Sequence, residues 1–270
     1  MYSKSLDTFA YLAASKAQML RSNPVGFLLS SAMAGAYVGM GILLIFTIGQ
    51  NIDPSVRSLA MGTSFGIALT LVVFAGSELF TGHTMIMTIG LLHGKVGLSS
   101  LAASWFCTWI GNLIGSVLLA LLFYSGGGGQ ILKEGADLIF KVSAYKMNSP
   151  ATELVARGIL CNWLVCLALW TSARATSDAA RCILIFWCLF AFIACGFEHS
   201  VANMTIFSVA LLGNYPATVS LSGMAHNLAW VTLGNAVSGA LFMGVAYWLV
   251  NGGAKTIKVP SPGSSTIPAE

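Results

Sequence analysis

The amino-acid sequence predicts an all-α membrane protein with six transmembrane helices, arranged as two inverted repeats of three. The first observation behind this prediction is composition: 8% of the 270 residues are charged and 56% are hydrophobic, whereas a soluble domain has about 25% charged residues. The other two are long uncharged segments and a polar motif that occurs in two of them. The composition excludes a water-soluble enzyme, a disordered chain and a nucleic-acid-binding protein, which needs clustered Lys and Arg.

Six uncharged or nearly uncharged segments predict the transmembrane helices. A membrane-spanning helix needs roughly 20 mostly apolar residues to cross about 30 Å of hydrocarbon. The apolar residues are continuous and do not alternate, which argues against a transmembrane β-barrel. A single glutamate interrupts the second and the fifth segment, so we expect these two helices to be broken in the middle. The segments lie at about 25–49, 58–94, 98–124, 154–173, 182–212 and 224–250.

The two ends of the chain differ from this central part, residues 23–250. Residues 251–270 are rich in Gly, Ser and Pro, which predicts a disordered cytoplasmic tail. Residues 1–22 predict a cytoplasmic amphipathic helix that lies on the membrane or on a neighbouring subunit. Its apolar residues recur at helical spacing between charged ones, and they are Leu6, Phe9, Ala10, Ala13, Ala17 and Leu20.

Six spans place both chain termini on the same side of the membrane. Short cytoplasmic loops of membrane proteins carry an excess of Lys and Arg. The side of the termini carries more basic residues than the other side, so we expect both termini to face the cytoplasm and the protein to lie in the inner (cytoplasmic) membrane. The first side carries Lys4, Lys16, Arg21, Lys95, Arg174, Arg181, Lys255 and Lys258, and the second carries Arg57, Lys133, Lys141 and Lys146.

Two similar polar motifs interrupt the second and the fifth predicted span. They are GSELFTGH at 76–83 and GFEHSVAN at 196–203, and each is followed by a span with a Gly-Asn pair, at 111–112 and 234–235. Each half holds an odd number of spans, so the second half must enter the membrane from the opposite side. Broken helices at matching positions of two inverted halves indicate a solute site near the middle of the bilayer.

Glu78 and Glu198 place a carboxylate at each break. An ionisable group within a membrane span is costly, which makes it a functional candidate. The alternative is structural, because a carboxylate at a helix break can accept the free N–H groups of the interrupted backbone. His199 follows Glu198 at the second break, and an ordinary histidine can change charge near pH 6.5. A lone buried histidine is more often a hydrogen-bonded core residue, but the break, the repeat and the following Asn203 favour a pore role for His199. His83 and His226 each lack one of these three features, so a pore role is less favoured for them.

The sequence predicts no cofactor, no metal site and no enzyme activity. The four histidines have no zinc-ligand spacing, and the chain contains no nucleophile elbow, phosphate-binding loop or dinucleotide motif.

Several segments resemble the formate/nitrite transporter family, and its nitrite channel branch in particular. The segments are NPVGFLLSSAMAGAYVGMGI at 23–42, GSELFTGHTM at 76–85, CNWLVCLALW at 161–170, GFEHSVANMT at 196–205 and HNLAWVTLGNAVSGALFMG at 226–244. The resemblance implies an aquaporin-like six-helix protomer that assembles as a homopentamer, with a separate pore in each protomer. It also implies transport of a small monovalent anion such as formate, nitrite or hydrosulfide. From the composition we expect the lipid bilayer to surround the protein and no nucleic acid to bind it.

The resemblance also assigns residues to the pore. The substrate pathway comprises the central histidine His199, the threonine Thr81 of the first break, Lys146, the polar neighbours Asn162 and Asn203, and Glu198. Two apolar constrictions around the histidine involve Leu69, Leu79, Phe80, Val165 and Phe192, without a division of these residues between the two.

The first break favours nitrite as the substrate. The formate branch tends to have an aspartate followed by Ser-Thr in this loop, whereas this chain has Glu78 and then Gly82 and His83. We expect His199 to hydrogen-bond the anion or to protonate it, so that it crosses the constrictions as the neutral acid. A formate or hydrosulfide channel and a proton-coupled nitrite symporter stay open as alternatives.

Overall fold

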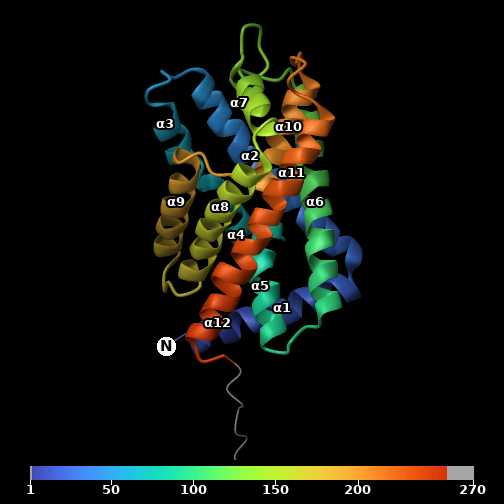
Figure 1. Ribbon diagram of the computed structural model, residues 1–270, viewed down its shortest axis with the longest axis vertical. Coiled ribbons are helices and arrows are strands. Elements are labelled where there is room, and N and C mark those ends of the chain that lie inside the picture. The colour runs from blue at the N-terminus through green and yellow to red at the C-terminus, as the bar shows by residue number, and fades with distance from the viewer. Residues whose placement is uncertain (1, 254–270) are drawn as a thin grey trace, which may run out of the picture.

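The chain folds as a bundle of helices, most of which run along the long axis of the molecule (Figure 1). The computed structural model describes residues 2–253, and no β-strand occurs in that part of the chain. The predicted all-α class is therefore confirmed for these residues. Except for 251–253, the predicted disordered tail at 251–270 lies outside the described residues.

The first helix lies across one end of the bundle, beside the last one (Figure 1). There the ring of Tyr2 is 5.4 Å from the ring of Tyr247. In chain order the helices are α1 (Ser3–Ser22), α2 (Pro24–Gln50), α3 (Arg57–Ser64), α4 (Gly66–Ala75), α5 (Phe80–Leu92), α6 (Leu98–Ser125), α7 (Leu138–Met147), α8 (Ala151–Ser172), α9 (Asp178–Ala194), α10 (Ser200–Leu212), α11 (Leu221–Val237), the π-helix η1 (Ser238–Val245) and α12 (Ala246–Val250).

Five helical segments of the described chain are long and apolar enough to cross a bilayer. The predicted segment 58–94 divides into one such segment and the shorter α5. The predicted segment 182–212 divides into α9 and α10, of 17 and 13 residues, neither of which reaches the required length alone. The five segments are Pro24–Gln50, Arg57–Ala75, Leu98–Ser125, Ala151–Ser172 and Leu221–Val250.

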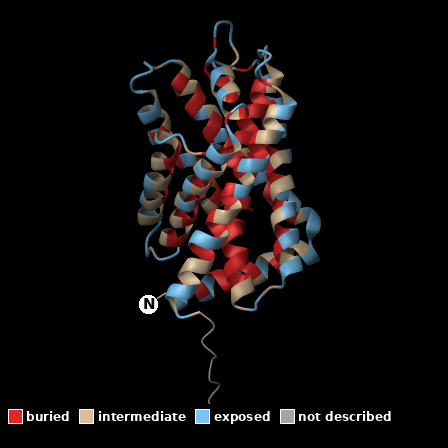
Figure 2. Ribbon diagram, in the orientation of Figure 1, coloured by how far each residue is buried: buried red, intermediate tan, exposed pale blue. Residues whose placement is uncertain are grey.

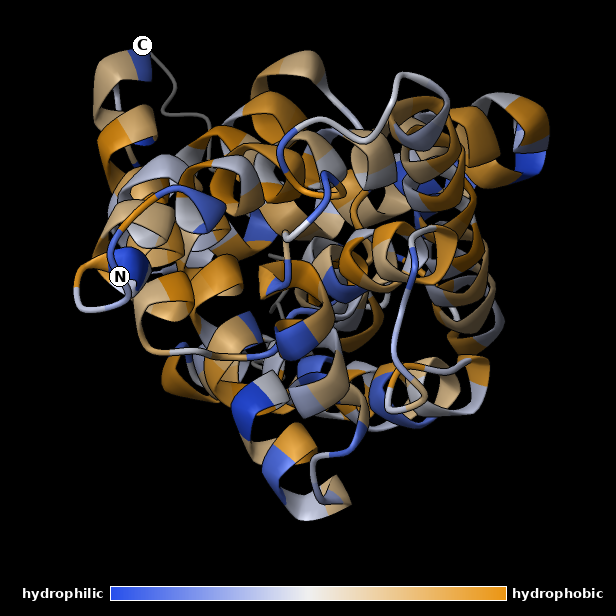
Figure 3. Ribbon diagram, turned by 90° about the horizontal axis from the view of Figure 1, so that it is seen from above, coloured by the Kyte–Doolittle hydropathy of each residue, from blue (hydrophilic) through white to orange (hydrophobic). Residues whose placement is uncertain are grey.

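The two short helices α5 and α10 occupy the centre of the molecule. Nearly every residue of both is buried (Figure 2), and a helix that is apolar around its whole circumference belongs in a protein interior. The surrounding helices instead expose large apolar side chains, including Phe106, Leu122 and Trp187. Seen along the bundle, apolar residues cover much of its outer faces (Figure 3), which suits contact with lipid.

A glycine in the left-handed region ends the helix before each of these short helices. Gly76 (φ 73°) follows α4, and Gly196 (φ 71°) lies just after α9. Residues with a Cβ avoid this conformation, whereas glycine adopts it freely and commonly ends helices in this way. Non-helical backbone at 76–79 and 195–199 therefore precedes α5 and α10.

An asparagine holds the backbone at each of these non-helical segments. Asn112 of α6 accepts from Phe80 N–H at 2.9 Å and donates to the carbonyls of Glu78 at 2.9 Å and Ser31 at 2.7 Å. A buried backbone group without a partner costs about 1–3 kcal/mol. The side chain of Asn112 thus provides hydrogen-bond partners for backbone groups at the start of α5.

Asn235 makes the corresponding contacts at the second segment. It accepts from Ser200 N–H at 3.0 Å and donates to the carbonyls of Glu198 at 3.0 Å and Gly158 at 2.8 Å. Each Asn follows a glycine of the Gly-Asn pairs seen in the sequence. The asparagines of these pairs therefore hold the start of α5 to α6 and the start of α10 to α11.

Glycine also permits the close packing of α2 against α6. A Cβ on Gly115 would lie 1.8 Å from the carbonyl oxygen of Ala32, and one on Gly35 would lie 2.1 Å from that of Asn112. Real Cβ atoms do not approach backbone so closely, so only glycine fits at these positions. Small residues at membrane helix contacts have this role in general.

Two elements were not predicted from the sequence. The helix α7 lies in a polar loop region, and η1 winds part of the last apolar segment as a π-helix. Within η1, a Cβ on Gly239 would lie 1.8 Å from Thr84 Oγ1. The last segment therefore packs directly on α5.

Candidate functional site

Three cavities follow one another through the molecule. The first, the α7-side vestibule, has a volume of about 350 Å³ and is lined by Arg57, Lys146, Glu198 and His199 among others. The second, the central cavity, measures about 10 Å³, which is room for about one water molecule. The third, the α1-side vestibule, measures about 340 Å³ and is lined by Lys16, Glu78, Leu79 and His83 among others.

Shared lining residues connect these cavities in series. Phe192 and His199 line both the α7-side vestibule and the central cavity. Leu69 and Leu79 line both the central cavity and the α1-side vestibule. The three cavities therefore adjoin in series, and the narrow central one is lined by His199 and otherwise by apolar side chains.

A buried ion pair lies in the α7-side vestibule. Lys146 Nζ is 2.9 Å from Glu198 Oε2, and the side chain of Glu198 is 1% exposed. Asn203 Nδ2 donates to the same oxygen at 2.6 Å and also lies 2.9 Å from Asn227 Oδ1. Asn227 in turn donates to the carbonyl oxygen of Lys146 at 2.9 Å, which ties the end of α7 to α11.

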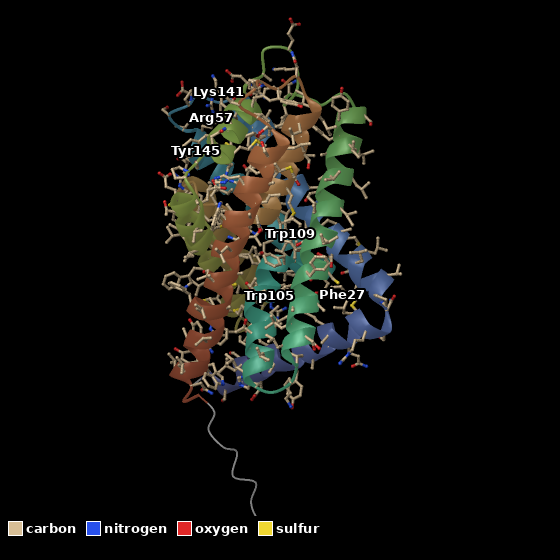
Figure 4. The ribbon with its side chains drawn as sticks, turned by 45° about the vertical axis from the view of Figure 1, so that its right-hand side comes forward. Phe27, Arg57, Trp105, Trp109, Lys141 and Tyr145 are labelled. Carbon is tan, nitrogen blue, oxygen red and sulfur yellow. The ribbon has the colours of Figure 1, made fainter. Side chains whose placement is uncertain are left out.

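Arg57 adds a second cation to this vestibule. Its Nε donates to the carbonyl oxygen of Gly49 at 2.9 Å, and its Nη2 lies 3.3 Å from that of Ile52. Figure 4 shows Arg57 and Tyr145 together at the α7 end of the bundle. Arg57 was not predicted as a site residue, because nothing in the sequence around it indicates that the start of α3 lies beside α7.

A matching ion pair lies in the α1-side vestibule. Glu78 Oε2 contacts both Lys16 Nζ and His83 Nε2. Lys16 was missed as a site residue, although it lies three residues after Ala13 and four before Leu20 and hence on the apolar face of α1. That placement of a lysine is the sequence signal that indicates its role.

Neither glutamate accepts backbone N–H groups at its break. The N–H groups of Phe80 and Ser200 are instead bound by Asn112 and Asn235. The alternative prediction, that each glutamate accepts the free N–H groups of the interrupted backbone, is therefore wrong. Each carboxylate faces a vestibule and binds a lysine there.

His199 lies between the α7-side vestibule and the central cavity. Its Nδ1 accepts from Ala202 N–H at 3.2 Å and so caps α10. With Nδ1 as the acceptor, a neutral imidazole carries its proton on Nε2, which lies 3.2 Å from Thr81 Oγ1. The ring of Phe192 stacks on the imidazole at 5.9 Å. His199 thus offers one polar N–H where the path is narrow and apolar.

Four of the five predicted constriction residues line the central cavity, namely Leu69, Leu79, Val165 and Phe192. Phe80 does not, because α5 begins there and turns its ring against Trp105 at 6.4 Å. Trp105 and Trp109 lie on α6, away from the α7 end (Figure 4). Lining residues that the sequence did not single out are Val38, Phe65, Ala68 and Leu189.

Thr81 and Asn162 lie behind the path and line none of the three cavities. Thr81 reaches the path only through His199. Asn162 Nδ2 lies 2.6 Å from the carbonyl oxygen of Asn235 and 3.0 Å from Thr84 Oγ1. The asparagine predicted as a pore neighbour is therefore engaged in holding α5 and α11 together.

Comparison with known proteins places this architecture in a family. The model of the formate/nitrite transporter family matches residues 5–249. The chain is 53% identical to the nitrite transporter NirC of Escherichia coli (strain K12) over 92% of each chain.

Two solved structures are similar as well. A channel described as an FNT family ion channel is 52% identical with a TM-score of 0.89, over 92% of this chain and 99% of that one. A pentameric formate channel with formate bound is 27% identical with a TM-score of 0.70, over 84% and 96%. From the family match and these similarities it follows that the chain belongs to the formate/nitrite transporter family.

Proposed function

We propose that this protein transports nitrite through a pathway that runs, within each protomer, along the three cavities. The observation that carries the proposal is their serial arrangement between two buried lysine–glutamate pairs, with His199 at the narrow section. Nitrite is favoured over formate because identity is 53% to a nitrite transporter and 27% to a formate channel. Formate and hydrosulfide are the alternative substrates.

The proposed membrane arrangement has six spans in two inverted repeats. The broken second span comprises α3, α4 and α5, and the broken fifth comprises α9 and α10. The matching contacts of Asn112 and Asn235, and of Glu78 and Glu198, support this repeat. α1 and α12 lie at one end (Figure 1), which with the distribution of basic residues supports cytoplasmic termini in the inner membrane.

The proposed assembly is a homopentamer. The pentameric formate channel shares the fold of this chain with a TM-score of 0.70. Large apolar side chains on the outer helix faces supply surface for both lipid and neighbouring protomers.

In the proposed mechanism, the cations of the vestibules compensate part of the cost of removing water from the anion. Transfer of an unpaired ion into apolar surroundings is prohibitive without such partners. Lys146 and Arg57 act at one end and Lys16 at the other. Each lysine also binds a glutamate, so its attraction for the anion is moderate and the anion can leave again.

At the central cavity the anion exchanges these partners for His199. A space of about 10 Å³ does not hold nitrite, so passage requires the side chains of Leu69, Leu79, Val165 and Phe192 to move aside. The Nε2–H of His199 then donates to the anion in place of Thr81. Either this hydrogen bond alone or a proton passed to the anion lowers the barrier to crossing.

Purified protein in liposomes tests the proposed function. We expect nitrite to enter faster than formate or hydrosulfide, and much faster than in liposomes without protein. Membrane current recorded under a nitrite gradient separates a channel, which carries net charge, from electroneutral proton symport. Nitrite entry no faster than in protein-free liposomes would remove the proposal.

A further inference from the structure

The two vestibules differ in one residue that binds the buried glutamate. Glu78 is bound by His83, and Glu198 is bound by Asn203, in each case the fifth residue after the glutamate. In both vestibules this glutamate also binds a lysine, and in both an asparagine holds the backbone beside it. The glutamate of one vestibule is therefore bound by an imidazole, which can take up a proton, and the glutamate of the other by an amide, which cannot. His199 also lines the α7-side vestibule, but its Nδ1 accepts from Ala202 N–H and is not free to take a second proton.

We infer that His83 sets the charge of the α1-side vestibule, so that anion binding from that side strengthens on acidification whereas binding from the α7 side does not. This inference rests on the proposed function, since it concerns how the same pathway takes up its anion at each end. His83 acts here as a residue that adjusts the site and not as a carrier of protons through the membrane.

The surroundings of His83 accommodate both of its protonation states. The side chain is buried, and its Nδ1 lies 2.8 Å from Ser104 Oγ and 3.3 Å from Thr108 Oγ1. The Thr108 hydroxyl donates to the Ser104 carbonyl at 2.6 Å, so its oxygen is left as an acceptor. The Ser104 hydroxyl proton is free to point at the ring.

Neutral and protonated His83 can therefore occupy the same position. When the ring is neutral, its Nε2–H donates to Glu78 and its Nδ1 accepts from Ser104. When the ring is protonated, Nδ1–H donates to Thr108 Oγ1 and Nε2–H still donates to Glu78. A histidine in a purely structural role needs only one of these arrangements.

Within residues 2–253, two residues supply the charges next to His83. Lys16 of α1 and Glu78 contact it or share its partner oxygen. The neighbouring α6 contributes the hydroxyls above, and α2 contributes the ring of Phe27 at 5.9 Å. The charged residues of α8, Glu153 and Arg157, lie in its first two turns, His226 lies in the second turn of α11, and η1 has no charged residue.

The net charge of the α1-side cluster follows directly. Lys16 and Glu78 cancel while His83 is neutral, and the cluster gains one positive charge when His83 is protonated. At the other end Lys146 and Glu198 cancel, Asn203 stays neutral and Arg57 adds one positive charge that is present in both states. One added unit charge near the anion is expected to lower the half-saturating nitrite concentration about fivefold or more, by Coulomb attraction in well-hydrated surroundings.

Side-selective measurements with exchanged residues test the inference. The half-saturating nitrite concentration is measured from each side of oriented proteoliposomes at about pH 7.5 and about pH 5.5, a range in which histidine is the side chain that ordinarily changes charge. The readout is the ratio of the two concentrations. In the parent protein we expect a ratio of about five or more from the α1 side and about one from the α7 side.

His83→Asn should reduce the α1-side ratio to about one, and Asn203→His should raise the α7-side ratio. His93→Asn is the matched control, because His93 caps the end of the same helix and binds only the carbonyl of Ile89; it should retain the parent ratios. An α1-side ratio that is unchanged in His83→Asn would overturn the inference, as would an unchanged α7-side ratio in folded Asn203→His. The second variant keeps the test decisive if the first does not fold.

Calorimetric binding of nitrite to the detergent-solubilised protein separates this inference from the proposed function. Binding that is tighter at about pH 5.5 in the parent and insensitive to pH in His83→Asn supports the inference even if no flux occurs. Absence of flux with such binding would overturn the proposed function alone. Binding with no pH dependence in the parent would overturn the inference.

Discussion

Replacement of His199 by asparagine is expected to lower nitrite flux about ten- to a hundredfold while the protein still folds. Asparagine is a good helix N-cap, so it retains an acceptor for Ala202 N–H, but it removes the Nε2–H that faces Thr81. A hydrogen bond to a charged group contributes about 1.5–3 kcal/mol, and the anion has no other polar partner beside the central cavity. Flux into proteoliposomes measures the effect.

His226→Asn is the control for this substitution. His226 lies 3.1 Å from the carbonyl oxygen of Ser149 and lines none of the three cavities of the pathway. We expect its flux to match the parent. Parent-like flux in His199→Asn, with the same amount of assembled protein, would show that His199 is not part of the transport step.

Removal of the Lys146 charge is expected to have the largest effect on stability. Lys146→Met leaves Glu198, with a side chain 1% exposed, without its cation, and breaking a buried ion pair costs about 3–5 kcal/mol. The double variant Lys146→Met with Glu198→Gln removes both charges and should regain most of that stability. It should still bind nitrite more weakly than the parent from the α7 side, because Lys146 is absent and Arg57 is the remaining cation of that vestibule.

Lys141→Met is the matched control on the same helix. Lys141 pairs with Asp137, and the two side chains are 74% and 58% exposed, so the change should stay within about 1 kcal/mol. Thermal unfolding in detergent and the half-saturating nitrite concentration are the measurements. If Lys146→Met is as stable as Lys141→Met and takes up nitrite equally well, the buried pair has neither role.

The long apolar helices and the two non-helical segments at 76–79 and 195–199 could be predicted because their signals are local. Uncharged runs mark helices that lipid surrounds, and Gly76 and Gly196 stand where the chain must enter the left-handed region. The grouping of Lys146, Glu198 and His199 was also predicted, and the structure brings these three residues to one vestibule.

The remaining features depend on contacts between distant parts of the chain. Lys16 and Glu78 are 62 residues apart, and a single sequence does not show that α1 docks beside the first break. The resemblance to the family placed both Leu79 and Phe80 in the constrictions, yet Leu79 lines the central cavity while the ring of Phe80 packs on Trp105. The resemblance implied that Asn162 is a neighbour of the pore, whereas Thr84 and the carbonyl oxygen of Asn235 bind its amide.

Nitrite flux through assemblies of mixed composition shows whether each protomer of the proposed pentamer has its own pathway past His199. Parent protein and His199→Asn are co-expressed at known ratios, purified together and reconstituted at equal total protein. Independent pathways predict that flux falls in proportion to the fraction of variant protomers. A much steeper loss, in which flux varies as a high power of the fraction of parent protomers, would mean that the protomers share one pore. It would rule out a separate pathway in each protomer.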